Sequence, residues 1–94
     1  MGDSMAVADT IRAKLLAAFA PARLDIVDES HRHVGHAGAR EGGESHFRVR
    51  VVSAAFEGLG RVERQRRVYA ILSDELAGPV HALALELKTP AEAG

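Results

Sequence analysis

The chain contains no cysteine and no tryptophan, and aromatic residues make up 4% of its 94 residues. Without thiolates it cannot by itself build an all-cysteine zinc or iron-sulfur site, nor a disulfide framework. No apolar run reaches the length of a membrane span, and a formal net charge of -1 gives no bulk attraction to nucleic acid or anionic membranes. The start of the chain is acidic before its first apolar stretch, unlike a secretory signal, so we expect a cytoplasmic protein that does not enter membranes.

Five histidines stand out against these absences, because imidazole is the commonest protein metal ligand and titrates near neutral pH. Three of them, His31, His33 and His36, lie in one glycine-rich stretch. Their concentration suggests metal or proton chemistry, and a chain without cysteine would then supply part of a metal site. The alternative is a solvated loop whose histidines bind nothing unless a partner is present.

The length of the chain fits one small domain, which we place at residues 6–88, with flexible termini at 1–5 and 89–94. Apolar residues at every fourth position from Val7 to Phe19 predict an amphipathic helix over residues 6–20, which Pro21 stops.

Three segments have the composition of strands: residues 24–29, 46–53 and 82–87. The second alternates cleanly, which directs Phe47, Val49 and Val51 inward and the residues between them outward. The first two strands are predicted to pair as an antiparallel hairpin around a glycine-rich loop over residues 30–43.

A second helix is predicted over residues 62–77, where Val62, Tyr69, Leu72 and Leu76 form one apolar stripe. The segment before it reads as a loop. The order helix, strand, strand, helix, strand predicts an α+β sandwich with the helices packed on one face of the sheet.

Five short motifs occur in one order along most of the chain, and together they resemble the BolA family. A set of motifs in a fixed order is far more specific than any one of them. The motifs are Asp28-Glu-Ser, Glu44-Ser-His-Phe, Val51-Val-Ser-Ala-Ala-Phe-Glu-Gly, Arg61-Val-Glu-Arg and Val80-His-Ala-Leu.

The resemblance implies a fold similar to class II KH domains, with the order α-β-β-α-α-β, a three-stranded mixed sheet and a short helical turn around residues 54–58. It also implies a non-enzymatic protein, a monomer in isolation, that pairs with a monothiol glutaredoxin. The pair would assemble, traffic or sense iron-sulfur clusters in iron homeostasis. An older proposal for the family is transcription regulation through DNA binding.

In the family picture a 2Fe-2S cluster is shared by a glutaredoxin cysteine, the glutathione thiolate and ligands from the BolA-like protein. The match of Val80-His-Ala-Leu makes His81 the first expected ligand. His33 is the preferred second ligand from the loop, followed by His36, and His31 is the least favoured. His46 is expected to serve cross-strand packing instead.

One position departs from the family pattern. Family members usually carry Arg-His-Arg where this chain has Arg64-Gln65-Arg66. Glutamine is a poor metal ligand and cannot replace histidine in proton transfer, so position 65 is not expected to be essential to a metal site here.

The competing function is nucleic-acid or partner binding through an arginine-rich patch near the second long helix, with Arg48 and Arg50 of the neighbouring strand close by. Glu57 and Glu63 partly neutralise this patch, and no Gly-x-x-Gly clamp of RNA-binding KH domains is present. No nucleophile-base pair or phosphate-binding loop indicates an enzyme. The patch consists of Arg61, Arg64, Arg66 and Arg67.

Overall fold

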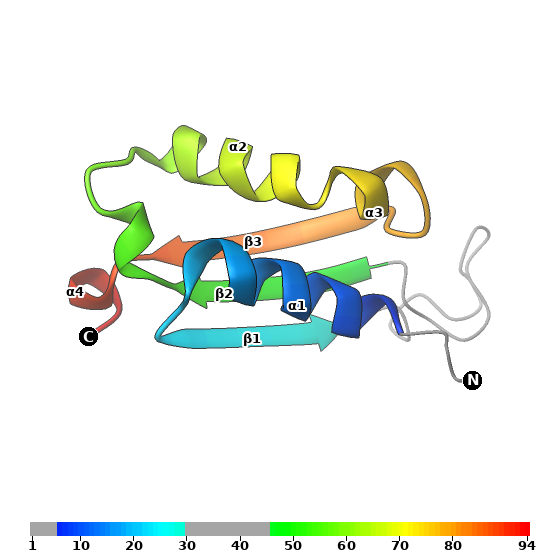
Figure 1. Ribbon diagram of the computed structural model, residues 1–94, viewed down its shortest axis with the longest axis horizontal. Coiled ribbons are helices and arrows are strands. Elements are labelled where there is room, and N and C mark those ends of the chain that lie inside the picture. The colour runs from blue at the N-terminus through cyan, green and yellow to red at the C-terminus, as the bar shows by residue number, and fades with distance from the viewer. Residues whose placement is uncertain (1–5, 30–45) are drawn as a thin grey trace.

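The computed structural model of the chain describes residues 6–29 and 46–94. Its elements follow the order that the family resemblance implies, and each strand boundary lies within one residue of the sequence prediction (Figure 1). The elements are α1 (Val7–Phe19), β1 (Arg23–Asp28), β2 (His46–Val52), η2 (Ala54–Phe56), α2 (Arg61–Ile71), α3 (Ser73–Ala77), β3 (Ala82–Lys88) and α4 (Pro90–Ala93).

The three strands form one mixed sheet in the order β1-β2-β3. β1 and β2 pair antiparallel, with Ile26 opposite Val49, whereas β2 and β3 pair parallel, with Val49 opposite Leu85. Parallel neighbours need a crossover connection, and η2, α2 and α3 provide it. The predicted hairpin and the mixed three-stranded sheet are confirmed.

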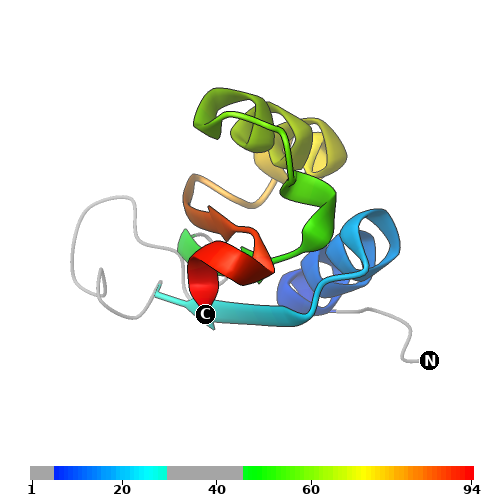
Figure 2. The same ribbon diagram turned by 90° about the vertical axis from the view of Figure 1, so that its left-hand side faces the viewer.

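α1 and α2 cover the same face of the sheet, as a view along the strands shows (Figure 2). The predicted alternation in β2 is confirmed, because the side chains of Phe47, Val49 and Val51 are buried against the helices while Arg48 is exposed. The predicted α1 stripe is confirmed in the same way. The core consists of Ile11, Leu15, Phe19, Phe47, Val49, Val51, Phe56, Val68, Leu72 and Val80.

The prediction for the second helix is wrong in its length and in half of its buried stripe. The segment forms two helices, α2 and α3, that meet at Leu72, where the backbone leaves the helical region at φ -100° and ψ 20°. Val62 and Tyr69 are 61% and 41% exposed, whereas Val68 is fully buried. On the buried side of this helix the side chain of Arg64 also reaches inward, where it donates to the carbonyl oxygens of Leu59 and Leu87.

Two segments expected to be irregular contain short helices. The segment before α2 includes the 3-10 turn η2, as the resemblance implied, and the buried Ser53 begins it by accepting a hydrogen bond from the N–H of Ala55. Residues 89–94, predicted as a flexible tail, contain α4 instead. Thr89 is buried and forms a capping box with Glu92, in which each side chain accepts a hydrogen bond from the backbone N–H of the other residue.

Candidate metal centre

The expected ligand His81 lies at the end of the sheet where three strand ends meet. β1 ends at Asp28 and β2 begins at His46, and the N–H of Glu29 donates to the carbonyl oxygen of His46 at 2.8 Å. Because β3 runs parallel to β2, its first residue, Ala82, lies opposite His46. His81 directly precedes Ala82, so the parallel register brings two histidines that are distant in sequence to one end of the sheet.

The rings of His46 and His81 are in contact. Their centroids lie 6.2 Å apart, and the ring planes cross at 63°, an edge-to-face arrangement. His81 is exposed and His46 is half-buried. His46 therefore has the cross-strand packing position expected from the sequence, and its neighbour is the very histidine that the family motif singles out.

The loop histidines His31, His33 and His36 lie outside the described residues. The segment that carries them joins Glu29 to His46, and these two residues are hydrogen-bonded through their backbones. Both attachment points of the segment therefore lie at the same end of the sheet as His81.

Glu29, at this end of the sheet, forms an ion pair with Arg48. The Nε of Arg48 donates to Oε2 of Glu29 at 2.9 Å, and the Glu29 side chain is 16% exposed. The hydrogen bond to Glu29 and the negative charge of Glu29 raise the pKa of Arg48 above its ordinary value. Glu29 thus stabilises the cation of Arg48 on the strand that carries His46.

The described residues offer an incomplete ligand set for a metal. Within residues 6–29 and 46–94, no three side chains of histidine, cysteine, aspartate or glutamate gather closely enough to hold an ion. The chain as a whole has no cysteine. What this end of the sheet presents is one exposed imidazole, that of His81, beside a second ring.

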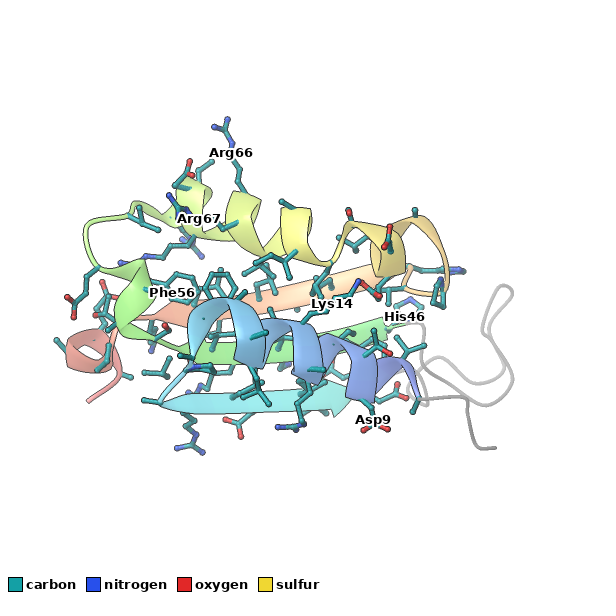
Figure 3. All side chains as sticks on the ribbon, in the orientation of Figure 1. Asp9, Lys14, His46, Phe56, Arg66 and Arg67 are labelled. Carbon is teal, nitrogen blue, oxygen red and sulfur yellow. The ribbon has the colours of Figure 1, made fainter. Side chains whose placement is uncertain are left out.

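The four arginines of the predicted basic patch have different environments. Arg64 is held inside the fold: it donates to two carbonyl oxygens, pairs with Glu92 and lies 5.8 Å from the ring centroid of Phe56. Arg67 pairs with Glu63 one turn earlier, at 3.3 Å. Arg66 points away from the body of the protein (Figure 3).

Arg61 and Arg66 are exposed, and neither forms an ion pair within the part of the chain that the structure describes. The expected contribution of Arg48 and Arg50 to this patch is wrong, because their side chains lie on the sheet face opposite α2. Arg50 pairs there with Glu86 at 2.8 Å. The cationic surface of α2 is therefore smaller than the sequence suggests.

Gln65 lines a groove of about 510 Å³ between the start of α2 and the end of β3. The groove also includes Leu85, Lys88 and Glu92. Because strands rise by about 3.3 Å per residue, even Leu85 is roughly 13 Å along the chain from His81. Position 65 is thus at the far end of β3 from the expected ligand.

With the sheet, the helix order and the histidine pair established, comparison with known proteins identifies the family. Residues 15–92 match the model of the BolA-like proteins. The chain belongs to the BolA family. Mouse BolA-like protein 1 is 52% identical over 82 residues, which are 87% of this chain and 57% of the mouse protein. This BolA-family chain therefore spans little more than half the length of that relative.

A bacterial relative and a solved structure agree with this assignment. The protein described as the DNA-binding transcriptional regulator BolA of Escherichia coli K12 is 46% identical over 85 residues, 90% of this chain and 77% of that protein. The BolA domain of SufE1 from Arabidopsis thaliana has a TM-score of 0.81 and 41% identity, covering 95% of this chain and 99% of that domain. The α+β BolA fold is thereby confirmed. No helix among the described residues has the length and apolar character needed to cross a membrane.

Proposed function

We propose that this BolA-family protein is non-enzymatic, monomeric in isolation, and pairs with a monothiol glutaredoxin to bind, traffic or sense a shared 2Fe-2S cluster. The observation that carries the proposal is the exposed imidazole of His81 at the end of the sheet, in a chain without cysteine. Its backbone directly precedes the first residue of β3, while its side chain stays accessible to a partner.

The chemistry of the ligand set divides the site between two proteins. The thiolates would belong to the glutaredoxin cysteine and to glutathione, and the BolA-family chain would contribute neutral imidazoles. Histidine in place of cysteine on one iron raises the reduction potential of a 2Fe-2S cluster. This chain would bind the cluster through the ring nitrogens of its histidines, and their position would determine where the partner docks.

His81 is the proposed first ligand, and the second comes from the segment between Glu29 and His46. We place it at His33, with His36 as the next choice. The support is topological: both ends of that segment meet at the backbone hydrogen bond between Glu29 and His46, beside His81.

The experiment is reconstitution of the complex from this chain, a monothiol glutaredoxin, glutathione and iron, followed by visible absorption and magnetic spectra. We expect His81→Ala to change the spectra and to shorten the life of the cluster, and His33→Ala to do so to a smaller extent. His31→Ala is the matched control, since it removes a histidine from the same segment and should leave the spectra unchanged. Unchanged spectra for His81→Ala would show the ligand assignment to be wrong.

The pH dependence of the same complex gives an independent check. Imidazole must be neutral to bind a metal, because a proton competes with the metal for the ring nitrogen. The cluster should therefore be lost as the pH falls. A cluster equally stable at pH 5 would argue for ligation without histidine.

A second candidate function is DNA binding, which is the function named for the Escherichia coli relative. Arg61 and Arg66 favour it, because both are exposed on α2 and such cations bind phosphates. The net charge of -1 limits such binding to a local contact of low affinity. A salt-dependent gel shift on a promoter fragment would support this function, and absence of binding at low salt would exclude it.

A further inference from the structure

We infer that His46 is a positioning residue for His81: its ring packs against the His81 ring and restricts the directions in which the His81 nitrogens point. The inference rests on the proposed function, in which His81 is a cluster ligand. It assigns a purpose to a histidine that the ligand hypothesis leaves without one.

The backbones of the two histidines are held independently of each other. The carbonyl oxygen of His46 accepts the N–H of Glu29, which fixes the first residue of β2. On the other side, the buried Val80 donates its N–H to the carbonyl oxygen of Glu75 at 2.9 Å, so the residue before His81 is tied to α3. The ring contact therefore joins two rigid supports, and the remaining freedom of His81 lies in its side-chain torsions.

The contact is of a kind that orders a side chain. An exposed histidine on its own samples several rotamers, but the His81 ring has an edge-to-face neighbour at 6.2 Å. Aromatic pairs in this geometry favour the packed arrangement by roughly 2- to 10-fold. A ligand must be held within about 0.5 Å of its working position. Because the His81 ring already favours one arrangement, it loses less side-chain freedom when it binds the cluster.

The burial of the two rings indicates which histidine positions and which one binds. His46 is half-buried within the sheet, whereas His81 is exposed and open to a partner. A ring that supports its neighbour through packing is replaceable by another ring of similar shape. A ring that ligates through nitrogen is not. This difference makes phenylalanine at position 46 the informative substitution.

The first test uses the isolated protein and needs no cluster. We would compare His46→Ala, His46→Phe and the control Arg50→Gln, which changes an outward-facing residue of β2 farther from His46, and record the His81 ring resonances by NMR. We expect His46→Ala to move these resonances toward those of a short unstructured peptide, and His46→Phe to retain a ring-to-ring nuclear Overhauser effect. If the His81 resonances and the rotamer averaging of its side chain were the same in His46→Ala as in the unchanged protein, the inference would be wrong. Thermal unfolding checks that each variant is folded, and His46→Gln replaces His46→Ala if that variant is not.

The second test uses the complex with glutaredoxin, glutathione and cluster. His46→Ala should accelerate cluster loss roughly 2- to 10-fold, in line with the lost packing preference, and His46→Phe should restore a rate close to that of the unchanged protein. If His46→Phe instead behaves like His46→Ala and removes a nitrogen coupling in pulsed magnetic spectra, His46 is a ligand and the positioning role is wrong. If the unchanged protein forms no cluster complex, the proposed function fails, while the NMR test still reports on the ring contact.

Discussion

Arg64 and Glu92 form a two-pronged ion pair that ties α2 to the helix after β3. Nη1 of Arg64 lies 2.6 Å from Oε1 of Glu92, and Nη2 lies 3.2 Å from Oε2. The same carboxylate accepts the N–H of Thr89 at 2.9 Å. The Arg64 hydrogen bonds, followed by the Thr89 backbone hydrogen bond, lower the pKa of Glu92 from its ordinary value of 4.5 to about 2.

This lowered pKa predicts that α4 is lost in acid. A carboxyl group whose pKa is lower in the folded state contributes stability above its ordinary pKa, and that stability disappears as the pH falls through the folded-state value. We therefore expect α4 to detach between about pH 4.5 and 2, seen as the Ala93 and Gly94 amide resonances moving to unstructured positions. Local resonances are the right measurement, because Arg50 also lowers the pKa of Glu86 and both groups affect global unfolding.

Glu92→Gln is the variant that isolates this effect. It removes the titrating group, so the Ala93 and Gly94 resonances should be displaced already at neutral pH and should change little on acidification. If the unchanged protein kept α4 intact at pH 2, the ion pair would not be what holds it.

The sequence predicts those parts of the fold whose signal is local. Strand β2 alternates between apolar residues and arginines, so its inward face follows from the pattern of period two alone. The signal for α4 was also present, since Thr89-Pro-Ala-Glu92 has the form of a capping box with proline at the first helical position. Its short length made it resemble a tail.

The parts that could not be predicted depend on contacts between distant segments. In the local pattern Val62 and Tyr69 are as suitable as Val68 to share an apolar stripe with Leu72, yet the structure buries Val68. Which face is buried depends on packing against other elements, and Arg64 accordingly bonds to Leu87 on β3. The contact between the two histidines depends on the parallel register of β2 and β3, which no local pattern reveals.

The choice of face on α2 gives a prediction with a built-in control. Val68→Ala removes two methyl groups from a fully buried side chain and should lower the free energy of unfolding by about 2 kcal/mol. Val62→Ala makes the same chemical change at an exposed site on the same helix and should stay within about 0.5 kcal/mol. Chemical denaturation measures both, and equal effects would mean that α2 packs by a different face.

The contact between α1 and α3 predicts an asymmetric response to losing one charge. Nζ of Lys14 lies 3.0 Å from both carboxylate oxygens of Glu75, whose side chain is 11% exposed. Lys14→Met leaves that carboxylate nearly buried without its partner and should cost about 1–3 kcal/mol of unfolding free energy.

Two companion variants define the cause of this cost. Lys14→Met combined with Glu75→Leu should recover most of the lost stability, because a buried pair replaced by apolar groups is close to neutral. Arg23→Met breaks the exposed pair with Asp25 and should cost less than about 1 kcal/mol. If the double variant were as unstable as Lys14→Met alone, packing rather than the unpaired charge would explain the loss.

The unequal environments of the α2 arginines predict which of them would act in any DNA binding. Arg61 and Arg66 are exposed, and replacing either with glutamine should reduce the salt dependence of binding by about one phosphate contact while leaving unfolding unchanged. Arg64→Gln should do the reverse, since it removes hydrogen bonds to Leu59, Leu87 and Glu92 and lowers stability. Binding titrations over a range of salt concentrations, paired with thermal unfolding, separate the two effects. If Arg64→Gln reduced the salt dependence of binding without lowering stability, Arg64 would contact phosphate in the complex instead of its internal acceptors. The DNA-binding surface of α2 would then include Arg64, contrary to this prediction.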